Sequence, residues 1–242
     1  MTTTDQGPIR IEPCAKRVRV FLGGHPVADT LTPLLVWESP HFPTYYFPAR
    51  DVDDKLLVAD GRRAQAPGRG EAEQFTVTAG AATAPGAALH YEDGDLKELH
   101  GHYRFDFDAM DGWFEEDEEI FVRPRDPHAR IDVLASSRHV RVEIDGVTVA
   151  DSRSALLLFE TGLPTRFYLP KPHIRMDLLQ PSDTVSRCPY KGSATYWSVR
   201  IEDTLHADLA WSYRTPLPEA QKVAGYVAFY QADIYVDGVL QS

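Results

Sequence analysis

Residues 140–151 read VRVEIDGVTVAD. Up to Ile144 apolar residues alternate with charged ones, which is the period of a strand with one buried face. Asp145-Gly146 supplies the positive φ that a two-residue hairpin turn requires, and the alternation resumes at Val147. This segment therefore predicts an antiparallel hairpin, and it indicates a mainly β protein.

The same pattern occurs once more, 122 residues earlier in the chain. A shift of that length places residues 9–57 on residues 131–179 without a gap, and 15 of the 49 aligned pairs are identical. A repeat this long indicates two domains in tandem rather than a solenoid of short repeats. We predict a first copy over residues 9–120, a linker over 121–130 and a second copy over 131–242.

Further apolar runs predict the remaining strands of each copy. In the second copy these runs lie at 156–159, 167–169, 196–201, 209–213 and 226–236. Helix signals are few: Pro218 suits the first turn of a short helix over 218–222, and residues 53–58 and 175–179 suit single turns. We expect each domain to consist of small antiparallel sheets, with one short helix or helical turn, around its own core.

Two stretches of the first copy break the strand pattern. Residues 59–73 are rich in Gly, Arg, Ala and Pro and are predicted to form a mobile loop. The acidic run Glu115–Glu119, followed by the two prolines of residues 123–127, predicts a solvated linker. Metal binding by this acidic run is the less favoured alternative.

Composition narrows the classes of partner. The 242 residues carry 36 acidic and 25 basic side chains, a net charge of -11, which disfavours nucleic acid and anionic membranes as partners. No apolar run approaches the ~20 residues of a membrane span, and residues 1–7 lack the features of a secretory signal. We therefore expect a cytoplasmic protein with Cys14 and Cys188 reduced. The excess of Arg over Lys, 19 against 6, suggests a GC-rich bacterial genome.

Three segments of the second copy resemble the signature of a known family. They are RMDLLQPSD at 175–183, CPYKG at 188–192 and ATYWSV at 194–199. In this order they resemble the bacterial and fungal family called domain of unknown function 427, and the resemblance covers essentially the whole second copy. It implies a β-tent fold, hence two tandem β-tent-like domains, and no established activity.

The first copy resembles a divergent member of the same family. It keeps Glu38, Tyr46 and Pro48, but it has nothing like the segment 188–192 and carries Thr44 in place of Arg166.

Labels of the family hint at nucleotidyl transfer, which needs a glycine-rich phosphate loop and paired carboxylates for magnesium. Asp106 and Asp108 have the spacing of such a pair, and alternation along a strand would place them on one face. No glycine-rich strand-to-helix turn accompanies them, so we do not predict this reaction.

Cys188 is the candidate nucleophile of the second copy. Pro189 fixes a turn after it, and the ammonium of Lys191 favours a reactive thiolate nearby. The alternative interpretation is a small buried hydrophobic side chain at a turn, which is a common place for a cysteine.

Glu160 is the candidate general acid or base, because it follows a buried apolar run and emerges at its end. Its counterpart in the first copy is Glu38. The alternative is a structural ion pair repeated in both copies, with Arg141 beside Glu160 and Arg19 beside Glu38.

Other side chains of the second copy suit the lining of a site for a carboxylate or phosphate. They combine positive charge, hydroxyl groups and one aromatic wall. The proposed catalytic set is Glu160, Cys188, Tyr190 and Lys191, and the proposed substrate-binding set is Arg166, Tyr168, Tyr196 and Trp197. No cofactor is expected.

Two histidines resemble the start of a metal site. His100 and His102 share one face of an extended segment, and His90 or Asp106 is available as a third ligand. Neither spacing is diagnostic, so we interpret the pair as surface histidines and predict no metal site.

These observations lead to one functional hypothesis with two alternatives. A small polar or anionic molecule is processed or bound in a pocket of the second copy, with the first copy covering or stabilising it. Glu160 would move a proton, Arg166 and Lys191 would hold the anionic group, and Cys188 or Tyr190 would attack or donate. The alternatives are a non-catalytic binding module and a structural subunit. The reaction type and the oligomeric state stay open.

Overall fold

The computed structural model describes residues 9–40, 42–92 and 96–241. The chain forms two compact units, Met1–Asp126 and Pro127–Ser242. Both consist of antiparallel sheets linked by short 3-10 turns, which confirms the prediction of a mainly β protein with small antiparallel sheets. No helix of the described residues is long and apolar enough to cross a membrane.

The first unit contains two sheets. The larger has seven strands in the order β1 (Arg10–Pro13), β4 (Leu34–Ser39), β5 (Phe42–Pro48), β9 (His102–Phe105), β8 (Ala82–Tyr91), β7 (Gly70–Ala79) and β6 (Leu57–Ala66). The smaller has the order β11 (Glu118–Glu119), β10 (Gly112–Glu115), β2 (Val18–Leu22) and β3 (His25–Thr30). Four 3-10 turns, η1 (Ala49–Asp51), η2 (Asp54–Leu56), η3 (Lys97–Leu99) and η4 (Phe107–Ala109), link these strands.

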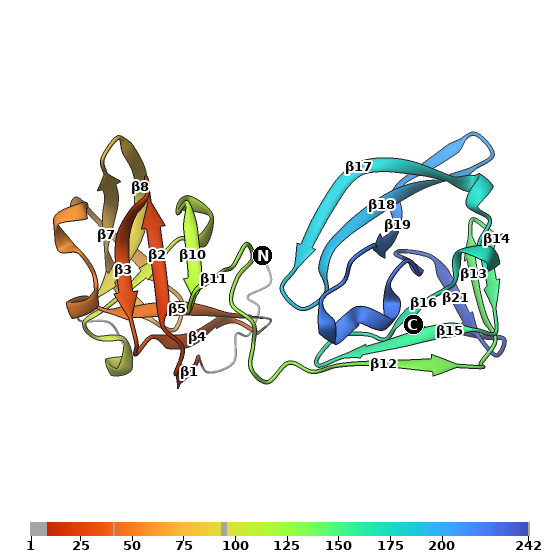
Figure 1. Cartoon of the computed structure of the whole chain (residues 1–242), viewed down its shortest axis with the longest axis horizontal. Coiled ribbons are helices and arrows are strands. Elements are labelled where there is room, and N and C mark those ends of the chain that lie inside the picture. The colour runs from red at the N-terminus through yellow and green to blue at the C-terminus, as the bar shows by residue number, and fades with distance from the viewer. Residues whose placement is uncertain (1–8, 41, 93–95, 242) are drawn as a thin grey trace. The chain divides into compact units, whose positions relative to one another are not determined.

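The second unit repeats this arrangement strand by strand. One sheet has the order β12 (Ile131–Ser136), β15 (Ala155–Glu160) and β16 (Arg166–Tyr168), and another has the order β17 (Leu179–Cys188), β18 (Gly192–Ile201), β19 (Thr204–Tyr213) and β20 (Val227–Phe229). A bridge between Leu169 and Val227 joins β16 to β20, so the combined order equals that of the seven-stranded sheet. Figure 1 shows β17 and β18 as a long curved hairpin, with β12 and β15 on the opposite side of this unit.

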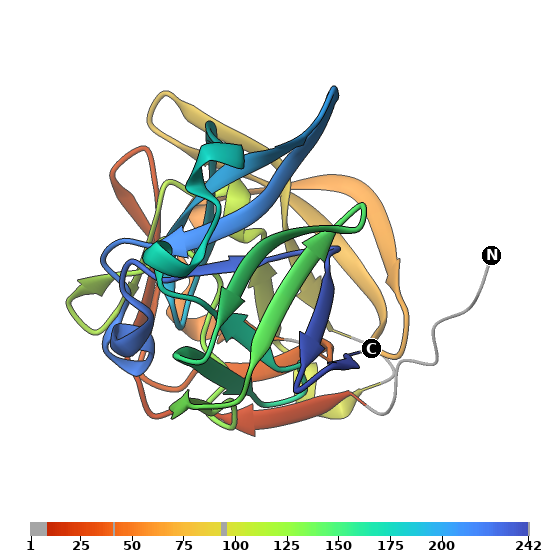
Figure 2. The same ribbon diagram turned by 90° about the vertical axis from the view of Figure 1, so that its right-hand side faces the viewer.

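The remaining sheet of the second unit contains the hairpin expected at residues 140–151. Its order is β14 (Val147–Ser152), β13 (Val140–Ile144), β21 (Asp233–Val236) and β22 (Val239–Leu240), and Figure 2 shows the green β13–β14 hairpin beside the dark blue β21. Asp145 and Gly146 have φ values of 50° and 75°, as the turn requires. Three 3-10 turns complete the unit: η5 (Lys171–His173), η6 (Met176–Leu178) and η7 (Pro218–Val223), the last with proline in its first turn as predicted.

The prediction of a mobile loop at residues 59–73 is wrong. These residues lie in β6 and β7, a hairpin whose register pairs Ala66 with Gly70. In the second unit β17 and β18 pair Cys188 with Gly192, so the shift of 122 residues continues through both turns. Gly and Arg are frequent here because the hairpin is exposed and bends at a bulge, which composition alone does not distinguish from a loop.

The acidic run at Glu115–Glu119 is also more ordered than the linker prediction implied. Its ends lie in β10 and β11, which pair with each other. Glu115 accepts a hydrogen bond of 2.9 Å from the Tyr45 hydroxyl and forms an ion pair with Lys16, and Asp117 lies 3.0 Å from Arg19. Basic side chains of the first unit therefore hold part of this run in place.

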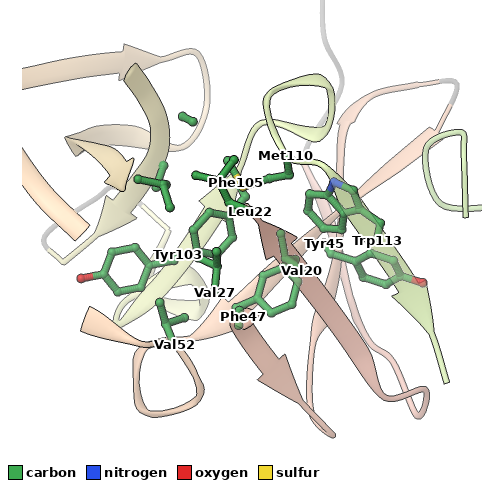
Figure 3. Packing of buried hydrophobic residues seen from close by; sticks show 14 of the residues in the cluster. Val20, Leu22, Val27, Tyr45, Phe47, Val52, Tyr103, Phe105, Met110 and Trp113 are labelled. Carbon is green, nitrogen blue, oxygen red and sulfur yellow. The ribbon is translucent and has the colours of Figure 1, made fainter. Parts of the chain in front are cut away.

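Each unit has a core between its sheets. In the first unit Phe47, Phe105 and Trp113 pack together, with ring centroids of Phe47 and Phe105 at 5.6 Å, and Figure 3 shows the labelled side chains of this core pointing toward one another. A second cluster on the other face of the large sheet contains Tyr46 and Tyr91. In the second unit the corresponding cluster contains Tyr168, Tyr213 and Trp211. The clusters around Glu38 and Glu160 are built on this second face.

Candidate functional site

The sequence-predicted site residues Glu160 and Lys191 form an ion pair in the second unit. Glu160 is the last residue of β15, and Lys191 lies in the turn between β17 and β18, followed by Gly192 with a φ of 92°. The two side chains are only 9% and 13% exposed. A pair this buried persists because each charge neutralises the other, and removal of one partner leaves the other uncompensated.

The alternative ion pair, between Glu160 and Arg141, is not the one that forms. Arg141 in β13 lies 3.2 Å from Glu143, and Arg19 in β2 lies 3.0 Å from Asp117. The identical Val-Arg-Val segments therefore place their arginines in β2 and β13. Glu38 and Glu160 lie at or next to the last residue of β4 and β15, which belong to other sheets.

Tyr168 and Cys188 lie beside this pair. The Tyr168 hydroxyl accepts a 3.3 Å hydrogen bond from Nε1 of Trp211 in β19. Burial raises the pKa of Tyr168 well above its usual range, with smaller contributions from neighbours that include Cys188 and Glu160. Burial likewise raises the pKa of Tyr213. Both phenols therefore stay neutral at physiological pH and act as hydrogen-bonding groups rather than bases.

Arg166 in β16 stacks on aromatic rings. Its guanidinium carbon lies 5.9 Å from the Trp211 ring centroid and 5.3 Å from that of Tyr230, and these two rings stack at 3.8 Å. Arg166 is half-buried, and among the described residues its N–H groups form no hydrogen bond or ion pair. Cation–π contact thus fixes the side chain and leaves its donors available.

The other predicted lining residues separate into two groups. Tyr196 in β18 lies 2.7 Å from the Ser186 hydroxyl and packs on the cluster of Tyr168 and Trp211, so it joins the site. Trp197 follows it in the strand, faces the opposite side, and packs against the core with Lys171 over its ring at 5.3 Å. The structure therefore does not bring Trp197 together with Tyr168 and Tyr196, because successive residues of a strand face opposite sides. Tyr190 is half-buried in the turn before Lys191.

The first unit has an equivalent cluster. Glu38 is the second-to-last residue of β4. Its carboxylate accepts a hydrogen bond of 2.7 Å from the Tyr46 hydroxyl and forms an ion pair with Arg69, whose Nη1 lies at 2.8 Å. Arg69 also donates to the hydroxyls of Tyr46 and Tyr91, at 3.0 and 3.2 Å. Arg69, in the turn between β6 and β7, thus stands where the second unit has Lys191.

The segment Ala66-Pro67-Gly68-Arg69-Gly70 is the counterpart of residues 188–192. The interpretation that the first copy has nothing like this stretch is therefore wrong. Proline, a basic residue and the final glycine recur in order, and Gly70 has a φ of 85°. Ala66 replaces Cys188, so the thiol belongs to the second unit alone.

A pocket of about 250 Å³ lies in the first unit at this cluster. It opens at the end of the large sheet where β5 begins and β9 ends, and Glu38, Arg69 and Arg104 contribute to its lining. Arg104 in β9 pairs in register with Tyr46 and reaches Glu38 through Nε at 3.4 Å.

The histidines and aspartates considered for metal binding do not converge. Nδ1 of His102 lies 3.0 Å from the carbonyl of His100, and Asp106 caps η4 by accepting from the amide of Asp108 at 3.2 Å, so the two aspartates belong to a turn rather than one strand face. Across the residues that the structure describes, no three His, Cys, Asp or Glu side chains are grouped as metal ligands would be.

Sequence reasoning missed Arg69, Arg104, Trp211, Tyr213 and Tyr230 as members of these clusters. The shift of 122 residues already aligns Arg69 with Lys191 and Tyr91 with Tyr213. The alignment of Arg69 with Lys191 was not used as evidence for a site, because residues 59–73 were predicted to form a loop.

Comparison with known families gives one match in each unit. The profile of the family described as "Domain of unknown function (DUF427)" matches residues 10–116 and residues 132–242. This agrees with a tandem arrangement and with the resemblance of the second copy. A search of curated proteins gave no match.

Proposed function

The chain belongs to the family described as domain of unknown function (DUF427), and because that description assigns no activity, we propose from the geometry that its second unit binds a small polar molecule through an anionic group. The observation that carries this proposal is Arg166, a half-buried arginine that contacts two aromatic rings and whose guanidinium N–H donors have no partner among the described residues. A guanidinium in this state suits a carboxylate or a phosphate, since both accept paired hydrogen bonds.

The buried tyrosines support a binding role in the same place. Tyr168 and Tyr213 stay neutral because burial raises the pKa of each phenol, so they offer hydroxyl groups without adding negative charge. Lys191 is engaged with Glu160, which fixes the turn around it and leaves Arg166 as the cation for a ligand. The second part of the chain also carries little net charge, which permits an anion to approach.

A titration followed on the indole N–H signal of Trp211 tests this proposal. Acetate and inorganic phosphate serve as probes, with chloride at the same ionic strength as the reference. We expect acetate or phosphate to shift the signal saturably, and Arg166→Gln to weaken that binding at least tenfold. Arg153→Gln, which removes an exposed arginine outside the cluster, serves as the matched control. Equal affinity in Arg166→Gln, or a signal that moves no further than in chloride, would contradict the proposal.

Catalysis at the same residues is the second candidate function. It is favoured by the position of the Cys188 thiol beside Tyr168 and within the turn that carries Lys191. The half-buried Cys14 of the first unit provides an internal reference for reactivity. If Cys188 is a nucleophile, an alkylating thiol probe at pH 7 modifies it much faster than Cys14; comparable rates favour packing, hence binding without bond changes.

We also propose that the protein works in the cytoplasm of a bacterium. The two cysteines are unpaired with each other, which agrees with a reducing compartment. The preference for Arg over Lys agrees with a GC-rich genome. Fractionation of the source cells tests the compartment.

A further inference from the structure

Three bulky side chains of the second unit have smaller counterparts in the first unit, and two of these counterparts line its pocket. Thr44 stands where the second unit has Arg166. Thr44 pairs with Val36 and Arg166 pairs with Leu158, and the shift of 122 residues aligns Val36 with Leu158. In the same way Leu89 replaces Trp211 and Asp106 replaces Tyr230. The stacked group of the second unit is therefore absent, and Thr44 and Asp106 instead line the pocket.

The positive charge of that group is nevertheless retained in the first unit. Arg104 lies in β9 opposite Tyr46, so it shares a sheet face with Thr44, two residues away in β5. Its Nε contacts Glu38, and among the described residues its two terminal nitrogens form no hydrogen bond. Arg104 thus offers the pair of donors that Arg166 offers in the second unit.

A second arginine reaches the pocket from the end of the unit. Arg123 is exposed, its guanidinium carbon lies 4.5 Å from the Phe42 ring centroid, and within the described part of the chain it forms no ion pair. The charge of Glu38 is balanced by Arg69. The positive charges of Arg104 and Arg123 therefore exceed the one negative charge of Asp106, the remaining acid of the lining. One net positive charge suits a single carboxylate, and Asp106 opposes a doubly charged group.

The rest of the lining is apolar and aromatic. Phe107 and Trp113 stack with ring centroids at 5.0 Å, and the other apolar members are Phe42, Tyr45, Pro67, Phe105 and Pro124. A volume of about 250 Å³ is below the ~300–1,000 Å³ of sites for drug-sized ligands, so a single ring fills it. Trp113 is only 3% exposed, whereas Phe107 is half-buried, so Phe107 is the ring of this pair that is available to stack on a flat ligand.

We propose that the first unit contains a second, separate binding site, which holds a small monocyclic aromatic carboxylate with its carboxylate on Arg104 and Arg123 and its ring against Phe107. The site does not depend on the ligand proposed for the second unit.

Calorimetric titration of the full chain with benzoate tests this inference. Benzamide, which has the ring without the charge, and acetate, which has the charge without the ring, are the matched probes. We expect saturable binding of benzoate and at least tenfold weaker binding of both others, because the site needs the two features together. Binding of benzamide or acetate as tight as that of benzoate would overturn the proposal, as would the absence of benzoate binding.

Three variants locate the bound benzoate. Arg104→Gln is expected to weaken binding at least tenfold, and Thr44→Arg to abolish it, because this change restores the side chain that the second unit has at that position. Arg50→Gln is the control, since Arg50 belongs to the same unit, is 70% exposed and lies outside the lining. Amide spectra of each variant verify that the unit is folded. Benzoate binding that survives Arg104→Gln but is lost in Arg166→Gln would place the ligand in the second unit and overturn the inference.

Discussion

Nη1 of Arg69 lies 2.8 Å from the Glu38 carboxylate and at the turn position that Lys191 occupies in the second unit. The same nitrogen donates to the hydroxyls of Tyr46 and Tyr91, whereas the Lys191 ammonium forms an ion pair with Glu160. The Tyr168 hydroxyl instead bonds Trp211. Each unit therefore joins its glutamate to a turn cation, but the surrounding bonds differ.

Glu160→Gln should destabilise the second unit by about 3 kcal/mol, because it leaves the Lys191 ammonium buried without its counterion. Urea unfolding followed on amide signals of the second unit measures the change. The double variant Glu160→Leu with Lys191→Met removes both charges and should recover most of the loss. If the double variant is as unstable as the single one, the pair is not the cause.

Tyr46→Phe should cost about 2 kcal/mol, since it removes a hydrogen bond of 2.7 Å to a charged carboxylate from a fully buried residue. Tyr168→Phe is its counterpart in the second unit and removes a 3.3 Å bond between neutral groups, which is worth about 1 kcal/mol. Unfolding of each unit in urea compares the two. Equal costs would show that the charge on Glu38 adds nothing to the first bond.

Gly23→Ala and Gly24→Ala should differ although the residues are neighbours in one turn. Both have positive φ, 57° and 77°, so each alanine costs roughly 1–2 kcal/mol of backbone strain. A Cβ at Gly23 would also lie 2.7 Å from the Ala79 carbonyl oxygen, whereas a Cβ at Gly24 meets nothing within 4 Å. The clash should add about 1–3 kcal/mol at Gly23 only. Urea midpoints that are the same for both variants would contradict this.

The first unit should lose stability as the pH falls below about 6.5. Burial lowers the pKa of His90, although Glu92 and Glu73 oppose the shift, and its buried Nε2 has no hydrogen-bond partner within the part of the chain that the structure describes. As the pH falls, His90 is therefore protonated in the unfolded chain before it is protonated in the folded chain. The contribution of neutral His90 to the free energy of unfolding is fully present above 6.5, its pKa in the unfolded chain. This contribution is lost as the pH falls through the lower pKa of His90 in the folded protein.

A histidine titration by NMR and unfolding at several pH values measure this effect. His90→Gln should flatten the pH dependence of the first unit but not remove it, since burial also lowers the pKa of His102. A His90 ring that titrates at or above pH 6.5 in the folded protein would refute the prediction.

The strands could be predicted wherever alternation and turn residues agreed. The hairpin at Asp145-Gly146 and the turn at Pro218 follow from local chemistry and formed as expected. The strands at residues 59–73 could not be predicted in this way. Their apolar face is made of alanines such as Ala66 and Ala72, and the hydrophobicity of alanine differs too little from that of the polar neighbours to reveal a period of two.

The candidate site could be predicted only in part. Glu160 and Lys191 were identified by residue type and position, and they are paired. Trp197 was predicted to form an aromatic wall of the site, but the pleat of β18 turns it to the face opposite Tyr196. Trp211 and Tyr230 come from distant strands, and their meeting with Arg166 depends on the order of the sheet.

Arg104 and Arg166 provide similar guanidinium donors but do not occupy aligned positions. Arg166 lies in β16, whose counterpart in the first unit is β5, whereas Arg104 lies in β9, the strand that pairs with β5. A comparison of aligned positions alone therefore records Thr44 as the loss of a guanidinium and overlooks Arg104 in the adjacent strand β9. Relatives of this chain are better compared by the positions of their arginine and lysine side chains in the folded units than by aligned positions alone. By that criterion the first unit keeps an arginine of its own, Arg104, and is not simply a copy that has lost Arg166.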